Sequence, residues 1–542
     1  MDLAKIQIDS AVAHGLYESG NATIDLSGSI TINNCGDDGY YSNGDSIRIE
    51  STGEITISQV SGSGMGFCGD YFNNQGKVSI DSSGHNGLYS SGKMINQDTI
   101  RVTNSGDRGF MNYDSLTNTA SGYIEITNSG TNDDGYYNDE YTLNQGGMVI
   151  SDIEDHGINT YYSFINEGDI SLINCNTGII TGGPFHNEGN FEIRNGDVGI
   201  YIDDDGFFDN SAIVSIDSSK EFGIYNDDSL YNDNGAFITI KGLHENNAVG
   251  FKTVDSDDIF VNDGKFYIYD TDSSAMINSG IIVNRDSLIL ERSDQTALLN
   301  LDSLYNDGGV LLISSSNGDD AGLTNESIEA TIRNEGIIKI ENGEGPGLFN
   351  NLGVITNLDS LIINNVADYG IDNAGTMMNV SGAIIVDGVG KGLFGDDLKE
   401  NAVVKKKLLD EKGVGIRNRS LTINTNFTNN GIVDVSDIFY GVVNLAEFIN
   451  NDSIPMGHCK TVGLQNSTSM SGFSTVFTNN SYLYITGDKG IETDADFTNS
   501  ALGEVIIRCD DDDFFESFIP GIFICEGTLD IGNTPSDPSD QN

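Results

Sequence analysis

A phrase of about 22 residues returns along most of this 542-residue chain, and the repeat limits the folds that the chain can adopt. Each copy has two apolar residues in alternation, then a glycine followed by apolar residues, then an Asn-x-Gly turn or a relative of it. One copy reads Val214-Ser-Ile216, Gly223-Ile-Tyr225 and Tyr231-Asn-Asp-Asn-Gly235. The alternation indicates short strands with one buried face, and such a unit must stack on its neighbours to bury that face.

This pattern predicts an all-β fold, a right-handed parallel β-helix (β-solenoid) of roughly 22 coils with three short strands in each coil. Each strand is expected to pair with its equivalent one coil away. The 66 glycines suit the elbows between strands, because glycine adopts unusual backbone angles at little steric cost. The turn asparagines are expected to form a structural ladder of stacked amides through Asn74, Asn144, Asn166, Asn187, Asn262, Asn306, Asn334 and Asn429.

The spacing of the repeat suggests three segments. Residues 1–429 are expected to form a regular β-helix, interrupted by a short helical insertion at 396–412 where apolar residues recur at helical spacing. Residues 430–531 have looser spacing and are expected to be degenerate terminal coils with longer loops. The Pro- and Ser-containing stretch at 532–542 is expected to be a linker to a further domain.

The insertion carries a cationic cluster in a strongly acidic chain, which has 82 acidic against 26 basic residues and a net charge of -56. It is either a solvated loop helix or an interface with another copy, a neighbouring domain or another partner. The interface residues would be Leu398, Val404, Lys405, Lys406, Lys407, Leu408 and Leu409. The overall charge disfavours nucleic acid as a partner, and without an apolar run of about 20 residues we expect no membrane insertion.

The start of the chain, Met1-Asp-Leu-Ala-Lys-Ile6, lacks a charged segment followed by an apolar run. Strand-like residues begin at once with Ile6 and Ile8. We therefore expect a fragment of a longer protein that is extracellular or at the cell surface, with export and anchoring signals outside the fragment.

The six cysteines form no CxxC pair and are expected to be small buried hydrophobic residues. The alternative for Cys509 and Cys525 is a disulfide near the C-terminal end of the solenoid.

Runs of aspartate are the candidate cation sites. Carboxylates on adjacent coils would repel one another, and a bound Ca²⁺ would relieve the repulsion. The best candidates are Asp203, Asp204, Asp205, Asp510, Asp511, Asp512 and Asp513. No EF-hand loop is present, so solvated turns are the alternative, and no other cofactor is expected.

Catalysis is not expected. The histidines His14, His85 and His156 lie at or next to the residue before an elbow glycine, which indicates drift of the repeat rather than a catalytic cluster. Basic residues are scarce where acidic ones gather, although glycan-cleaving enzymes need both on one face. A secreted polysaccharide-processing β-helix enzyme remains one alternative, and a Ca²⁺-dependent glycan-binding module is the other.

The phrases Asn166-Glu-Gly-Asp-Ile-Ser-Leu172 and Asn334-Glu-Gly-Ile-Ile-Lys-Ile340 resemble the repeats of filamentous-haemagglutinin-like and other β-solenoid bacterial surface adhesins. The acidic repeats are also similar to giant exported adhesins and grappling-hook filaments of gliding bacteria. The resemblance implies a structural and adhesive segment of a large secreted surface protein, acting as a rigid rod, filament or hook. Its implied partners are other copies of itself, cell-surface glycans, or a prey or host surface.

Overall fold

The computed structural model describes residues 5–533, except residues 131–132, 246, 317–319, 391–412, 420–425, 468–474, 510–514 and 518–522. These residues form an all-β parallel β-solenoid of about 20 turns and contain no helix. The predicted fold class is therefore confirmed. The predicted helical insertion at 396–412 lies outside the described residues, and no described helix is long and apolar enough to span a membrane.

Two compact units make up the chain, unit 1 from Met1 to Tyr267 and unit 2 from Ile268 to Asn542. The divisions predicted at residues 429 and 531 stay predictions. Each unit is described below by itself.

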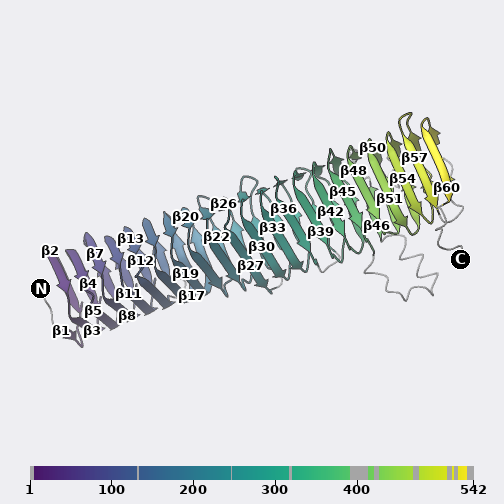
Figure 1. Ribbon diagram of the computed structural model, residues 1–542. Helices are drawn as coiled ribbons and strands as arrows, with labels where there is room; N and C mark the ends of the chain where they lie inside the picture. Colours follow the sequence, from purple (N-terminus) through teal and green to yellow (C-terminus); the bar gives the residue numbers. More distant parts are fainter. Residues whose placement is uncertain are drawn as a thin grey trace, which may run out of the picture. The chain divides into compact units, whose positions relative to one another are not determined.

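A coil of unit 1 consists of three strands, as in β5 (Glu54–Val60), β6 (Met65–Phe67) and β7 (Tyr71–Asn74). Each strand pairs in parallel with its equivalent in the next coil, β8 (Lys77–Ser83), β9 (Leu88–Ser90) and β10 (Lys93–Asn96). Figure 1 shows the first of these series, β5, β8 and β11 (Thr99–Ser105), side by side. The predicted inward pairs occupy the core, since the side chains of Ile55, Ile57, Val78 and Ile80 are at most 1% exposed.

A corner with left-handed backbone lies in or directly after the first strand of most coils. The residue with positive φ lies two positions after the second inward side chain of the strand. Asn128, two positions after Ile126, has φ of 56°, and Asn174, two positions after Leu172, has φ of 55°. Asparagine, aspartate and serine fill most of these corners, because a short polar side chain tolerates this conformation better than a bulky one.

The predicted asparagine ladder is present and longer than expected. In unit 1, each buried amide donates to the side-chain oxygen of the next, at 2.7–2.9 Å, through Asn74, Asn96, Asn118, Asn144, Asn166, Asn187, Asn210, Asn232 and Asn262. Neighbouring backbone carbonyls accept the other amide hydrogen in several coils. A buried amide without partners is costly, so each ladder bond stabilises the register of two coils.

Unit 2 contains two such ladders. One runs through Asn284, Asn306, Asn334, Asn357, Asn379, Asn429, Asn450, Asn479 and Asn499. The other, which was not predicted, runs through Asn278, Asn300, Asn325, Asn350, Asn373, Asn418, Asn444 and Asn466. The second and third strands of a coil in this unit thus both end on a buried amide.

Phenyl rings stack inside each unit. In unit 1, the ring of Phe185 lies parallel to those of Phe164 and Phe208, with centroid distances of 4.7 and 5.1 Å. In unit 2, Phe448 lies in the same way between Phe427 and Phe477, at 4.6 and 4.9 Å. The coil spacing of about 4.8 Å suits ring stacking, so equivalent phenylalanines on adjacent coils pack with little void.

The expectation that the cysteines are buried holds for four of the six, since Cys68 is half-buried and Cys525 is exposed. Cys35, Cys175, Cys459 and Cys509 are buried, and burial raises the pKa of the Cys175 thiol to about 12. Cys525 is exposed whereas Cys509 is buried, and no disulfide joins them.

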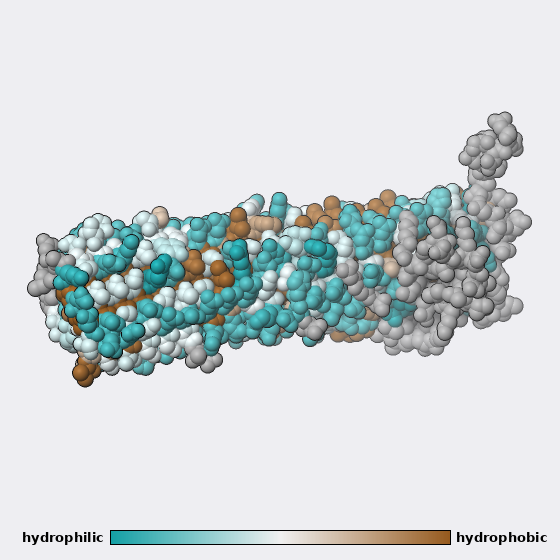
Figure 2. All heavy atoms as spheres, turned by 90° about the horizontal axis from the view of Figure 1, so that it is seen from below, coloured by the Kyte–Doolittle hydropathy of each residue, from teal (hydrophilic) through white to brown (hydrophobic). Residues whose placement is uncertain are grey.

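On the face drawn in Figure 2, hydrophilic side chains predominate and hydrophobic ones form short rows.

Candidate functional site

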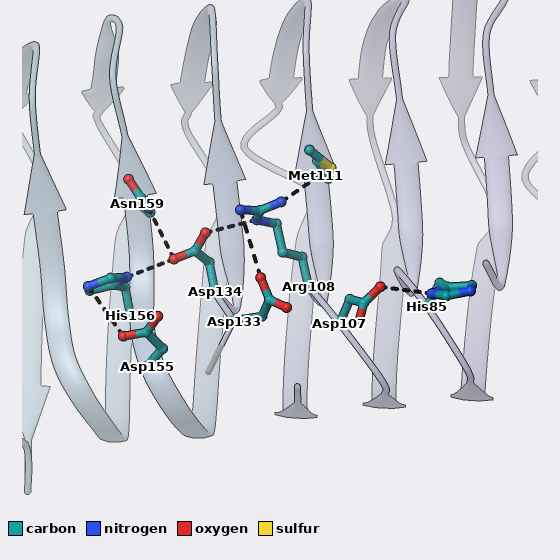
Figure 3. A network of polar contacts seen from close by, with 9 residues as sticks. All are labelled: His85, Asp107, Arg108, Met111, Asp133, Asp134, Asp155, His156 and Asn159. Atoms are coloured by element: carbon teal, nitrogen blue, oxygen red, sulfur yellow. Dashed lines mark hydrogen bonds and ion pairs between the residues drawn. The ribbon is translucent and has the colours of Figure 1, made fainter. Parts of the chain in front are cut away.

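An ion-pair network around the buried Asp134 links three coils of unit 1. Its members Arg108, Asp134 and His156 each precede an elbow glycine on three consecutive coils, before β12 (Phe110–Asn112), before β15 (Tyr136–Asn138) and within β17 (Gly147–Thr160). Backbone bonds hold them in register, since the amide of Gly109 donates to the carbonyl of Asp134 at 3.0 Å and that of Gly135 to His156 at 2.8 Å. Figure 3 shows the three side chains pointing toward one another.

The carboxylate of Asp134 is the centre of the network. Its Oδ1 accepts hydrogen bonds from Nδ1 of His156 at 2.8 Å and from Nδ2 of Asn159 at 3.1 Å, and its Oδ2 accepts one from Nε of Arg108 at 2.9 Å. The other ring nitrogen of His156 lies 3.4 Å from Asp155 (Figure 3). Asp134 is only 4% exposed, and each of its two oxygens accepts at least one hydrogen bond from the chain.

These contacts shift the pKa of Asp134 and the pKa of His156. Burial alone would raise the pKa of Asp134, but the hydrogen bonds from His156, Arg108 and Asn159 outweigh burial and lower it. Burial would lower the pKa of His156, yet the hydrogen bond to Asp134 and the charge of Asp155 raise it. The charged forms of both groups are therefore favoured in the fold.

The elbow glycines allow this close approach. A Cβ atom added to Gly135 would lie 2.6 Å from Cγ2 of Ile150 and 2.9 Å from the carbonyl oxygen of Gly157. No side chain fits between coils at that distance, so glycine is required there for space. The residue before each glycine is free to vary, and in these coils it carries the charge.

A second group of the same kind lies near the start of unit 1. Nδ1 of His14 is 3.4 Å from Asp38 and its Nε2 is 3.7 Å from Asp37. The imidazole lies against the rings of Tyr17 and Tyr41, which also stack on each other. Among the described residues, this group and the group Asp134, Asp155 and His156 each bring one ligand atom per residue within 4.8 Å of the others. Imidazole and carboxylate ligands suit a divalent transition metal. Arg108 already forms an ion pair with Asp134, so the His14 group is the better candidate for a metal site.

The predicted calcium residues are only partly covered by the structure. Asp203 is half-buried, and Asp204 and Asp205 are exposed on the turn between β22 (Val198–Ile202) and β23 (Phe207–Asn210). They face the carboxylates of the next coils: burial together with Asp258, Asp204, Asp255 and Asp203 raises the pKa of Asp227 to about 6. Asp510 to Asp513, and the predicted interface residues Leu398, Val404, Lys405, Lys406, Lys407, Leu408 and Leu409, lie outside the described residues.

A row of outward tyrosines lies next to the ion-pair network. It consists of Tyr89, Tyr113, Tyr137 and Tyr161, here called the tyrosine row, with successive ring centroids 5.6, 6.0 and 5.9 Å apart and rings inclined by 59°, 62° and 55°. Tyr113 and Tyr161 are 36% and 48% exposed. The guanidinium of Arg108 covers Tyr137 at 4.5 Å.

Unit 2 has a groove over its outward strand face. Five residues in register, Leu299, Thr324, Phe349, Asp372 and Arg417, lie on β34 (Leu298–Asn300), β37 (Leu323–Asn325), β40 (Leu348–Asn350), β43 (Tyr369–Asn373) and β46 (Val414–Arg419). They line a cavity of about 430 Å³.

A second ion pair, around the buried Asp372, lines part of this groove. Asp372, 4% exposed, accepts hydrogen bonds from Nε of Arg417 at 3.0 Å and from Nε of Arg419 at 2.8 Å. The guanidinium of Arg417 lies 3.7 Å from the ring centre of Tyr369. Two guanidinium groups therefore bind one carboxylate.

These ion-pair networks were not predicted from the sequence, although the sequence contains a signal for them. His14, His85 and His156 were interpreted as drift of the repeat, whereas each contacts an aspartate of the adjacent coil, His85 reaching Asp107 at 2.9 Å (Figure 3). Comparing the residues before consecutive elbow glycines would have placed opposite charges side by side.

Comparison of the chain with family models, with curated proteins and with solved structures finds no match.

Proposed function

We propose that the chain is a structural and adhesive segment of a large secreted bacterial surface protein, acting at the cell surface or in an extracellular filament. The observation that carries this proposal is the continuity of the buried ladders, such as the run from Asn74 to Asn262 in unit 1. Each coil is bonded to the next through side chains as well as strands, which supports a stiff scaffold whose outer residues vary freely.

The outer residues set the kind of partner. A net charge of -56 favours cationic or neutral surfaces over nucleic acid and anionic headgroups. We expect contacts with other copies of the chain, with neighbouring domains of the same long protein, or with glycans on a cell, prey or host surface. Calcium bridging at Asp203, Asp204 and Asp205 is part of this proposal, and no other cofactor is needed for it.

The groove of unit 2 favours a second candidate, a glycan-binding module. Its volume of about 430 Å³ suits a sugar, the ring of Phe349 lines it, and Asp320 and Glu326 provide acceptors for hydroxyl groups. A polysaccharide-processing enzyme is less well supported, because Asp372 is held by Arg417 and Arg419.

Attachment can be measured directly. Beads coated with the purified chain are expected to attach to cells of the source organism or of its neighbours, in the absence of any change in soluble polysaccharide. Beads coated with the heat-denatured chain, which has the same charge, are the matched control. If the beads fail to attach and the chain releases reducing sugar from a panel of polysaccharides, the chain is a polysaccharide-processing enzyme and this proposal is wrong.

A further inference from the structure

We propose that the tyrosine row of unit 1 binds an arginine-rich segment of a partner protein that runs along the direction of coil stacking. This inference rests on the proposed attachment role and names a surface and a partner chemistry for it.

The chain itself holds a guanidinium in this way at two places. In unit 1, Arg108 lies 4.5 Å over the ring of Tyr137 while its Nε donates to Asp134 at 2.9 Å. In unit 2, Arg417 lies 3.7 Å over Tyr369 while its Nε donates to Asp372 at 3.0 Å. A tyrosine face and a carboxylate on neighbouring positions therefore form a guanidinium site in this scaffold.

The tyrosine row repeats the aromatic half of that site. Its rings are inclined by 55–62° to one another, which leaves notches between them rather than a flat platform. A sugar ring stacks best on flat, coplanar faces, whereas a guanidinium enters a notch and contacts two rings. Tyr113 and Tyr161 present the most exposed of these faces.

A carboxylate lies in line with the exposed tyrosines. Asp139 directly follows β15, as Tyr113 directly follows β12 and Tyr161 directly follows β17. The amide of Asp139 donates to the carbonyl of Asn112, the residue before Tyr113, at 3.0 Å. Asp139 is close enough to the ring of Tyr137 that its charge, after burial, raises the pKa of that phenol to about 12. The row thus lies in a negative field that attracts a cationic segment.

The spacing suits long, flexible side chains on an extended peptide. Coils advance about 4.8 Å along the stacking direction, and side chains on one face of a strand are about 6.6–6.8 Å apart. The difference of about 2 Å for one step is within the reach of an arginine side chain, so two arginines separated by one residue can reach two successive notches. Arginine is preferred to lysine, because its planar group stacks on a ring and forms paired bonds to a carboxylate.

The test uses the full chain and a fluorescein-labelled peptide of alternating arginine and serine, with fluorescence anisotropy at about 150 mM salt. We expect the double variant Tyr113→Leu and Tyr161→Leu to bind the peptide about tenfold more weakly, since each exposed ring contributes a small cation–π attraction. Both side chains are exposed and the charge is unchanged, so circular dichroism should match that of the parent. Tyr305→Leu, at a 37% exposed tyrosine of unit 2, is the control and should bind like the parent.

The peptide of alternating lysine and serine has the same charge and should bind more weakly than the arginine peptide. Equal binding by the two peptides, or by the parent and the double variant, would reduce the interaction to general attraction between opposite charges and overturn the proposal. Binding of cellohexaose that the double variant loses would make the row a glycan platform, which also overturns it. If beads attach to cells although the parent fails to bind the peptide, this inference fails and the attachment role stands.

Discussion

Nδ1 of His156 lies 2.8 Å from Oδ1 of Asp134 on the preceding coil, and this contact couples the stability of unit 1 to pH. The lowered pKa of Asp134 means that its carboxylate stabilises the fold above the ordinary value near 4, and that this contribution is lost as the pH falls through the lower folded value. The raised pKa of His156 means the opposite: its contribution is complete below about 6.5 and is lost as the pH rises through the folded value.

We therefore expect the coils of β15 and β17 to be most protected between about pH 4 and 6.5. Hydrogen exchange measured across this range, with correction for the intrinsic exchange rate, checks the expectation. His156→Gln should flatten the decline above pH 6.5. His85→Gln is the control, because its imidazole is 63% exposed, and it should leave the profile unchanged. A parent profile that keeps its full protection up to pH 9 would contradict the coupling.

The asparagine ladder should respond strongly to the loss of one member. Asn166 donates to Asn187 and accepts from Asn144, both at 2.8 Å, and is fully buried. Asn166→Ala leaves both neighbours with an unpaired buried group, so we expect the free energy of unfolding to fall by about 1–3 kcal/mol. Urea unfolding together with hydrogen exchange of β18 (Phe164–Asn166) and β20 (Pro184–Asn187) measures the effect.

The matched control for the ladder is Asn190→Ala. Asn190 also donates to a neighbouring coil, to Asp169 at 2.8 Å, but the pair is exposed. Water replaces that partner, so the free energy of unfolding should change by no more than about 0.5 kcal/mol. If the two variants unfold at the same urea concentration, the buried ladder contributes no more than a surface bond.

Elbow glycines should be intolerant of alanine for reasons of space. In unit 2, a Cβ on Gly347 would lie 2.5 Å from Cγ2 of Ile363 and 2.9 Å from the carbonyl oxygen of Gly370. The coils must move apart to admit it, so Gly347→Ala should lower the midpoint of thermal unfolding. At Gly457 the nearest atoms are 3.9 Å away, and alanine there should raise stability by about 0.4–1 kcal/mol through the unfolded chain. Opposite signs in differential scanning calorimetry are the expected result.

The inward strand pairs and part of the ladder were predictable because they depend on spacing within a single coil. Ile124 and Ile126 alternate on one short strand, and that alternation has the same meaning in every copy. Ladder members without a following glycine were missed, such as Asn300, which precedes Leu-Asp, and Asn325, which precedes Glu-Ser. These asparagines are buried because each is the last residue of a strand, and the Asn-x-Gly motif marks a strand end in only some coils.

The outward features depend on which coils become neighbours, and variable loop lengths hide that from a search for short motifs. Arg108, Asp134 and His156 are separated by 26 and 22 residues in the chain yet adjacent in space. Tyr113 and Tyr161 follow the second strand of their coils, while Tyr89 and Tyr137 lie on that strand. Only an alignment of whole coils places these four rings in one row.

The carboxylates of Asp204, Asp227, Asp255 and Asp258 repel one another across adjacent coils. Burial and these charges raise the pKa of Asp227 to about 6, so the fold favours its protonated form and loses stability as the pH rises from about 4 to 6. Asp227→Asn removes this charge, and we expect a higher thermal midpoint than the parent at pH 7.5 but not at pH 4, where both are neutral.

Calcium provides the second readout for this cluster. If Ca²⁺ bridges the turns, adding it at pH 7.5 should raise the midpoint of the parent more than that of Asp227→Asn, because the ion neutralises the same repulsion that the substitution removes. Asp152→Asn, at an exposed aspartate of a distant corner, has the same net charge as Asp227→Asn and should respond to Ca²⁺ like the parent. Equal responses of all three chains would assign the effect to general screening, and Asp203, Asp204 and Asp205 would then be solvated turns.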